Sequence, residues 1–146
     1  MMRKINGLPH NRQGFTLIEV MIVVVIIGIM SAIAYPNYTD YVRRGARAEA
    51  MTVLLDAANK QEQFFVDNRR YSNDLGAIGV PRETGNGYFV ITLQNVTVDT
   101  FRVVATATAG PVRGDQECPA LTIDELGVRG VAGVVGQAQI DRCWER

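Results

Sequence analysis

The sequence of 146 residues has very little of the chemistry that enzymes use. It contains a single histidine, His10, and two cysteines, Cys118 and Cys143. It has no glycine-rich phosphate loop, no GxSxG motif, and no cysteine or histidine pair at the spacing of metal ligands. Its carboxylates are scattered rather than paired. These absences predict a protein that is not an enzyme, with no catalytic residue, no metal site and no cofactor.

The chain also lacks a strong excess of charge of either sign. Fifteen basic residues balance 15 acidic ones, and without the first 14 residues 12 basic and 15 acidic residues remain, a net charge of −3. Nucleic-acid partners favour a basic surface, and single strands favour aromatic residues placed between the basic ones. Neither pattern is present here, so the sequence disfavours DNA as a partner.

A long apolar segment lies near the N-terminus instead. Residues 15–35 contain one charge, Glu19, in 21 positions, and they follow a short basic leader. A helix of that length spans about 31 Å, enough to cross the hydrocarbon core of a membrane. Three interpretations fit: an ordinary membrane anchor, a secretory signal cut after Ala34, or a segment retained after cleavage between Gly14 and Phe15.

Glu19 distinguishes these interpretations, because a carboxylate inside a membrane costs about 3 kcal/mol on insertion scales. A signal core or a plain anchor gains nothing from it. The run Gly14-Phe15-Thr16-Leu17-Ile18-Glu19 resembles the leader and first helix of type IV pilins and pseudopilins. The resemblance implies cleavage after Gly14, N-methylation of Phe15, and pairing of Glu19 with the methylated amino terminus of a neighbouring subunit. Each of these charges is costly to bury alone in apolar surroundings, and pairing relieves that cost. The pair would therefore set the axial register between subunits.

The same resemblance implies the organisation of the chain and its partners. Residues 1–14 would be the leader peptide, 15–35 the transmembrane and assembly segment, and 36–146 the periplasmic globular domain. The expected partners are a prepilin peptidase with methyltransferase activity, other pilin subunits, and the inner membrane before assembly. The expected locations are the inner membrane, in a single pass, and then the extracellular pilus fibre.

One long helix is expected from the apolar segment to about Asn68. Gly28 and Pro36 are weak points in it, because glycine lowers helix propensity and proline removes a backbone donor. In pilins the helix is partly unwound at such positions in the assembled filament. Beyond residue 37 the helix becomes amphipathic. The residues expected to face the core are Met51, Leu54, Leu55, Ala58 and Phe65.

The second half of the chain has the composition of an antiparallel sheet. Residues 67–87 are rich in glycine, asparagine and proline and indicate a loop. Strands are expected at 88–93, 101–107, 120–124 and, less clearly defined, 127–131, followed by a loop-rich tail. With the resemblance, the fold class is α+β: a type IV pilin fold, with a long N-terminal helix on a sheet of about four antiparallel strands.

Two cysteines allow one intramolecular pairing, and an exported domain meets an oxidising compartment where disulfides persist. A Cys118–Cys143 bridge would stabilise the fold by about 3.5 kcal/mol in the chain-entropy model. Two separate buried thiols or a metal pair are the alternatives. The region from Cys118 to Gly130, closing on Cys143-Trp144, resembles the C-terminal region of PilE-type minor pilins, in which a disulfide closes the loop.

These features predict a structural subunit of the type IV pilus, more specifically a minor pilin. Such assemblies support twitching motility, adhesion or DNA uptake. A major pilin and a type II secretion pseudopilin are the related alternatives. A secreted soluble binding domain, released by a conventional signal peptidase, is the alternative from a different class.

Overall fold

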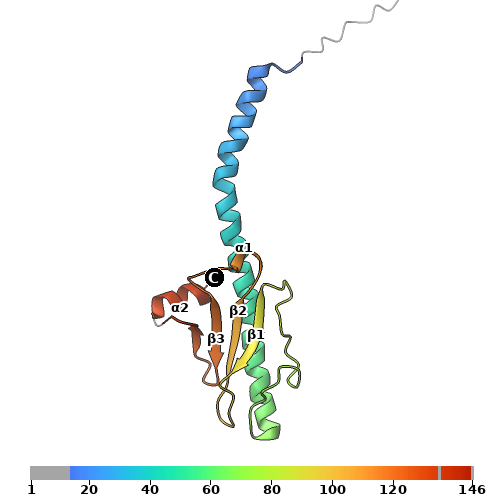
Figure 1. Cartoon of the computed structure of the whole chain (residues 1–146), viewed down its shortest axis with the longest axis vertical. Coiled ribbons are helices and arrows are strands. Elements are labelled where there is room, and N and C mark those ends of the chain that lie inside the picture. Colours follow the sequence, from blue (N-terminus) through green and yellow to red (C-terminus); the bar gives the residue numbers. More distant parts are fainter. Residues whose placement is uncertain (1–13, 135, 146) are drawn as a thin grey trace, which may run out of the picture. The chain divides into compact units, whose positions relative to one another are not determined.

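The computed structural model describes residues 14–134 and 136–145, so the leader peptide before Gly14 lies outside the described residues. The chain divides into two compact units, Met1–Asn37 and Tyr38–Arg146. Helix α1, Leu17–Asn68, has 52 residues and runs through the end of the first unit into the second. Figure 1 shows the elements in chain order. Each unit is described by itself below.

The second unit contains a four-stranded antiparallel sheet in the simplest order, β1-β2-β3-β4. The strands are β1 Phe89–Gln94, β2 Arg102–Ala107, β3 Ala120–Asp124 and β4 Arg129–Val131. Their register places Ile91 opposite Ala105, and Ala105 opposite Leu121. The alternation of branched and polar side chains puts one face of the sheet on the core. The expected strands and their antiparallel arrangement are confirmed.

The part of α1 within the second unit covers the apolar face of this sheet. Its buried positions follow helical spacing at Ala46, Ala50, Leu54, Ala57 and Gln61. They share one cluster with sheet residues such as Phe89, Val103 and Leu121, all fully buried. Small alanine side chains let the helix lie close to the strands. The α+β class with a long helix on the sheet is therefore confirmed.

The predicted core face of α1 was wrong in detail. Leu54 is fully buried, but its neighbour Leu55 is 39% exposed. Met51 and Ala58 lie at the edge of the core rather than in it. The buried face of α1 is rotated from the predicted one, toward the alanines and Gln61. A prediction from hydrophobicity alone places these residues in the core less readily than leucine. Close packing selects the smaller side chains there.

Helix α1 continues through both Gly28 and Pro36, so neither residue breaks it. The missing proline donor removes one hydrogen bond from the ladder, and a long helix can absorb that loss. Nearby, the Ser31 hydroxyl donates to the Ile27 carbonyl at 2.7 Å. Local unwinding at Gly28 and Pro36 stays a prediction for the assembled state.

The tail contains a helix that the sequence analysis did not predict. Helix α2, Gln137–Trp144, follows directly on Gly136, and a short 3-10 turn, η1, covers Gly110–Val112. Cys143 and Trp144 lie on the buried side of α2. The tail was expected to be loop-rich, and α2 was not foreseen in it, because an eight-residue helix is stabilised by tertiary contacts more than by its own propensity.

Candidate functional site

The expected cleavage site lies in exposed, non-helical backbone. Gly14, Phe15 and Thr16 precede the first residue of α1, and all three are exposed. The Phe15 side chain is 83% exposed, and nothing lies within 4 Å of where a Gly14 Cβ would be. Backbone of this kind can enter a peptidase site in extended form without first unwinding a helix.

Glu19 lies in the first turn of α1, three residues after a capping threonine. Its N–H donates to the Thr16 hydroxyl at 3.3 Å and to the Thr16 carbonyl at 3.1 Å. This is half of the Thr-x-x-Glu capping box, a signal that the sequence analysis missed. An acid at a helix start gains about 0.3–1 kcal/mol from the helix dipole. That gain is smaller than the cost of about 3 kcal/mol of placing a carboxylate in a membrane.

The Glu19 carboxylate itself accepts no hydrogen bond and forms no ion pair among the described residues. Capping therefore accounts for its backbone N–H, whereas its charge has no partner in residues 14–134 and 136–145. A charged carboxylate in an apolar setting is costly unless a cation lies nearby.

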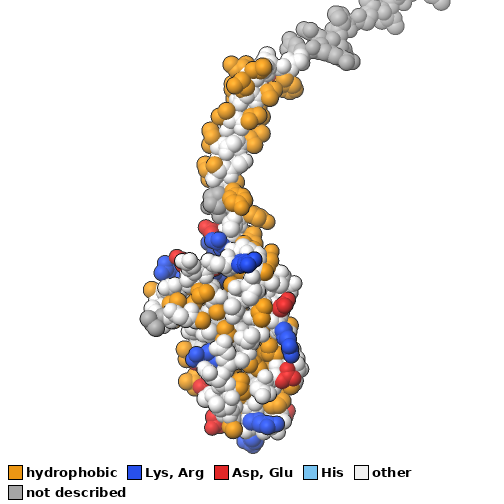
Figure 2. Space-filling model, viewed as in Figure 1, with side chains coloured by type: hydrophobic (Ala, Val, Ile, Leu, Met, Phe, Trp, Pro, Cys, Tyr) orange, Lys and Arg blue, Asp and Glu red, His pale blue; other side chains and the backbone are white. Residues whose placement is uncertain are grey.

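Within the described residues, no other part of the chain packs against the apolar segment that follows. Large side chains from Leu17 to Tyr35 are roughly half exposed or more. Figure 2 shows groups of hydrophobic side chains along this part of the helix. By length and composition α1 is able to cross a membrane, and none of its most apolar 18-residue window is buried. Both lipid and neighbouring apolar helices could cover such a surface.

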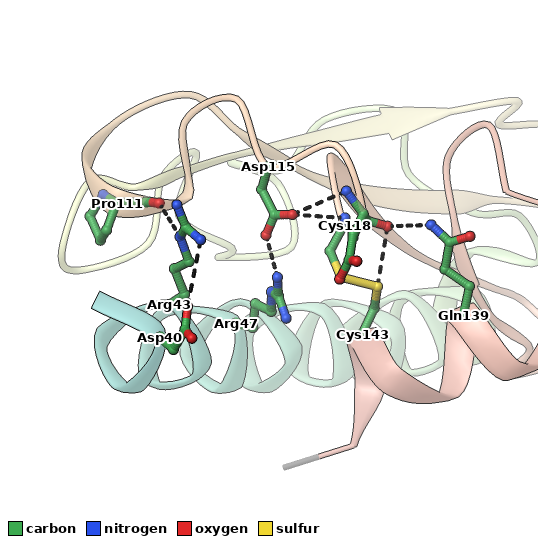
Figure 3. Close-up of polar contacts among 9 residues, drawn as sticks. Asp40, Arg43, Arg47, Pro111, Asp115, Cys118, Gln139 and Cys143 are labelled. Carbon is green, nitrogen blue, oxygen red and sulfur yellow. Dashed lines mark hydrogen bonds and ion pairs between the residues drawn. A yellow bond between two sulfur atoms is a disulfide. The ribbon is translucent and has the colours of Figure 1, made fainter. Parts of the chain in front are cut away.

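Two arginines of α1 bind the loop that leads to Cys118 (Figure 3). Arg43 donates through Nε to the Pro111 carbonyl at 2.8 Å and lies 3.6 Å from the Asp40 carboxylate. Arg47 forms an ion pair with Asp115, whose side chain is only 7% exposed. The Arg47 side chain is only 15% exposed.

Asp115 organises the loop as well as pairing with Arg47. Its second carboxylate oxygen accepts the N–H groups of Glu117 and Cys118 at 3.1 and 3.2 Å. Burial alone would raise the pKa of Asp115. The hydrogen bond from Arg47, the donors of Cys118 and Glu117, and the Arg47 charge outweigh burial, so the pKa lies below its usual value.

The two cysteines form a disulfide that closes the tail onto the sheet. The Cα atoms of Cys118 and Cys143 are 5.7 Å apart, an ordinary separation for a bridge. Gln139 of α2 donates to the Glu117 carbonyl at 2.9 Å beside it (Figure 3). Trp144 is buried, and its indole N–H donates to the Gly130 carbonyl at 2.9 Å. The expected disulfide-closed loop is confirmed.

Family comparisons agree with these features. The family model for the type IV minor pilin ComP, a DNA uptake sequence receptor, matches residues 36–122, and the prokaryotic N-terminal methylation motif matches residues 9–35. The chain belongs to the type IV pilins. Type IV pilins are structural proteins of pilus fibres.

Individual relatives place the pilin among fimbrial subunits. It is 49% identical to the type IV major pilin PilA of Myxococcus xanthus over 111 residues, 76% of this chain and 45% of PilA. It is 40% identical to the fimbrial protein EcpC of Eikenella corrodens over 101 residues, 69% of this chain and 65% of EcpC. This chain thus spans less than two thirds of the length of these relatives.

A solved structure supports the fold. The non-core minor pilin PilV of Neisseria meningitidis superposes with a TM-score of 0.51 at 24% identity, over 66% of this chain and 93% of PilV. At that identity the match speaks for the fold alone.

Proposed function

We propose that this pilin is cut between Gly14 and Phe15, methylated on Phe15, and built into a type IV pilus through its N-terminal helix. The single observation that carries the proposal is the environment of Glu19. This carboxylate stands in the first turn of an uncovered apolar helix and has no partner charge among the described residues. The methylated amino terminus of a neighbouring subunit would supply the missing cation.

The exposed backbone around Gly14 supports the first step of this sequence of events. A peptidase needs extended substrate, and residues 14–16 lie outside any helix or strand. The apolar surface from Leu17 to Tyr35 supports the later steps. It would hold the subunit in the inner membrane, with residues 36–146 in the periplasm, until other pilins replace the lipid.

Within this function we propose the role of a minor pilin. The family model that matches residues 36–122 carries a minor-pilin description, and the tail from Cys118 to Trp144 resembles PilE-type minor pilins. The major-pilin role is the second candidate, because the relative PilA of Myxococcus xanthus is a major pilin. Abundance separates the two: a major pilin dominates sheared fibres, and a minor pilin is present at a small fraction of them.

The description of the matched family also names a DNA uptake sequence receptor. We propose that this chain does not act as one. Without the leader its net charge is −3, whereas DNA binding depends on the release of counterions by basic residues. Tight, salt-dependent binding of duplex DNA by the purified pilin would overturn this part of the proposal.

The mass of the N-terminal peptide, measured on chain recovered from fibres and from membranes, tests the main proposal. The expected peptide begins at Phe15 and carries one added methyl group. A chain that begins at Tyr35 would instead identify a secreted domain released by a conventional signal peptidase. A chain that keeps residues 1–14 in assembled fibres would overturn the cleavage site.

A further inference from the structure

We propose that a groove at the start of the second unit binds a zwitterionic phospholipid, one whose headgroup carries a phosphate and a primary ammonium, while the subunit waits in the inner membrane. Phosphatidylethanolamine represents this class. The proposal rests on the membrane stage of the function proposed above and adds a lipid partner to it. It concerns a single subunit, and every residue of the groove belongs to the unit Tyr38–Arg146.

The groove is formed by one stretch of α1 together with residues just ahead of β1 and just after α2. It has a volume of about 700 Å³. Its apolar lining includes Tyr41, Ala48, Met51 and Tyr88. Pockets of about 300–1,000 Å³ bind small molecules, so this one has room for a headgroup with its glycerol. The apolar lining suits the glycerol and the first carbons of an acyl chain.

The groove begins close to the apolar segment along the chain. Tyr41 comes six residues after Tyr35, where that segment ends. Six residues rise about 9 Å in a helix and reach only about 20 Å when fully extended. The headgroup layer on each side of the hydrocarbon core is about 5–8 Å thick. A chain with residues 15–35 in the membrane therefore carries the start of this groove to the level of the headgroups.

Exposed tyrosines mark the same level of the chain. Tyr38 is 68% exposed and Tyr41 is 72% exposed. Three residues apart on a helix, they are neighbours on its surface. Tyrosine is enriched at the boundary between membrane and water, because its ring is apolar and its hydroxyl is polar. These two side chains favour lipid as the occupant of the groove that Tyr41 lines.

Arg44 supplies a cation for the lipid phosphate. Of the three arginines in this stretch, Arg43 pairs with Asp40, and Arg47 pairs with Asp115. Arg44 is exposed, lines the groove, and forms no ion pair among the described residues. A guanidinium binds phosphate through two parallel hydrogen bonds. At the level of the headgroups a phosphate is the group that best matches it.

Two carboxylates on the same rim call for a second, positive charge in the ligand. Glu49 and Glu145 line the groove together with Arg44. Glu49 accepts the side-chain and backbone N–H groups of Asn86, at 2.5 and 3.3 Å, but these donors are neutral and leave its charge uncompensated. Glu145 is exposed and has no ion pair in the part of the chain that the structure describes.

These rim charges distinguish between classes of lipid. A purely anionic headgroup would satisfy Arg44 but would be repelled by the two carboxylates. A headgroup with an ammonium beside its phosphate places a charge of each sign where the rim carries the opposite one. Electrostatic complementarity of this kind contributes specificity more than affinity. The groove should therefore select phosphatidylethanolamine over phosphatidylglycerol.

Native mass spectrometry of the full chain, purified from membranes in detergent, tests this selection. Phosphatidylethanolamine and phosphatidylglycerol are added in equal amounts, and the fraction of chain that retains each lipid is measured. The unaltered chain is expected to retain phosphatidylethanolamine in preference, by up to about fivefold. Equal retention of the two lipids, or a preference for phosphatidylglycerol, would overturn the proposal.

Arg44→Gln separates the groove from lipids that merely surround the apolar segment. It is expected to lower retention of phosphatidylethanolamine about tenfold, because it removes a charged hydrogen-bond donor. Arg102→Gln is the matched control: Arg102 is an exposed arginine at the start of β2, outside the groove, and its loss is expected to change nothing. Equal retention by the two variants would overturn the proposal.

Glu145→Gln tests the partner of the ammonium. It is expected to lower the preference for phosphatidylethanolamine toward equal retention of the two lipids, because one of the carboxylates that repel phosphatidylglycerol is gone. Glu83→Gln, at an exposed glutamate outside the groove, is the control and is expected to keep the preference. A preference that is unchanged in Glu145→Gln would overturn the pairing of Glu145 with the ammonium.

A photo-crosslinking amino acid, p-benzoylphenylalanine, locates the bound lipid. Placed at Met51 in the full chain, it is expected to gain the mass of one phosphatidylethanolamine when membranes are illuminated. Thr92, an exposed residue in the middle of β1, is the control position and is expected to gain none. Links from position 51 to a protein instead of a lipid would overturn the proposal. Failure of the membrane stage looks different: the chain would be recovered as a soluble product that begins at Tyr35.

Discussion

Arg47 of α1 and Asp115 of the loop before Cys118 form an ion pair that is shielded from solvent, with side chains 15% and 7% exposed. The two residues are 68 positions apart in the sequence. Because Asp115 also accepts the N–H of Cys118, the pair connects the long helix to the disulfide region.

Asp115→Asn should lower the free energy of unfolding of the full chain in detergent by about 3 kcal/mol at neutral pH, because Arg47 would stay buried without its partner charge. Asp56→Asn is the matched control, since Asp56 is half exposed and pairs with Lys60 on the helix surface. The control should change stability by less than about 0.5 kcal/mol. Urea unfolding followed by circular dichroism measures both, and equal effects would contradict the role of the buried pair.

The same pair predicts a pH dependence. The pKa of Asp115 is lowered in the folded state, so its stabilising effect is present above the unfolded pKa of about 3.9. That effect is lost as the pH falls through the folded pKa. The difference in unfolding free energy between the unaltered chain and Asp115→Asn should therefore be constant near neutral pH and shrink below about pH 4. A difference that grows with acid would contradict this sign.

Alanine substitutions at Gly110 and Gly114 should separate the cost of backbone strain from the cost of a steric clash. Gly110 and Gly114 both have a positive φ, of 62° and 76°. A Cβ on Gly110 would lie 2.4 Å from the Tyr88 ring, whereas a Cβ on Gly114 would meet nothing within 4 Å. Gly114→Ala should cost about 1 kcal/mol from strain alone. Gly110→Ala should cost about 1–3 kcal/mol more, because the Tyr88 ring must move. Thermal unfolding of the two variants in parallel checks this, and equal melting temperatures would contradict it.

The parts of the fold that depend on neighbouring residues could be predicted from the sequence. The motif Gly14 to Glu19 is contiguous, and the strands have the period and composition of an antiparallel sheet. Two cysteines allow only one intramolecular disulfide, Cys118 with Cys143. In each case the signal lies within a short window or allows a single outcome.

The parts that depend on distant partners could not be predicted. Gln61 looks like a surface residue, yet it is fully buried because its amide donates to the Ser72 carbonyl at 2.7 Å and accepts the Ser72 N–H at 2.9 Å. Asp115 has no local feature that points to Arg47. Helix α2 was not predicted, because the glycines that precede it indicate a loop. The burial of Cys143 and Trp144 stabilises this helix.

The disulfide should contribute much of the stability of the second unit. It encloses a loop with a sequence separation of 25 residues, so Cys118→Ser should lower the free energy of unfolding by about 3.5 kcal/mol in the chain-entropy model. The double variant Cys118→Ser/Cys143→Ser separates loss of the bridge from a leftover thiol. Both should unfold alike under oxidising conditions, and both should resemble the reduced, unaltered chain. An unaltered chain that unfolds identically with and without reductant would contradict a stabilising bridge.

Glu19→Ala should leave cleavage and methylation intact but reduce the share of the chain in sheared fibres. Removing the carboxylate makes the apolar segment easier to hold in the membrane, by about 3 kcal/mol on insertion scales, so the variant should accumulate there. Glu19→Gln keeps the size and the capping position and removes only the charge. If charge pairing sets the register, both variants should fail to assemble to the same extent. Normal assembly of Glu19→Gln with failure of Glu19→Ala would point to hydrogen bonding instead, because the amide oxygen can still accept a bond.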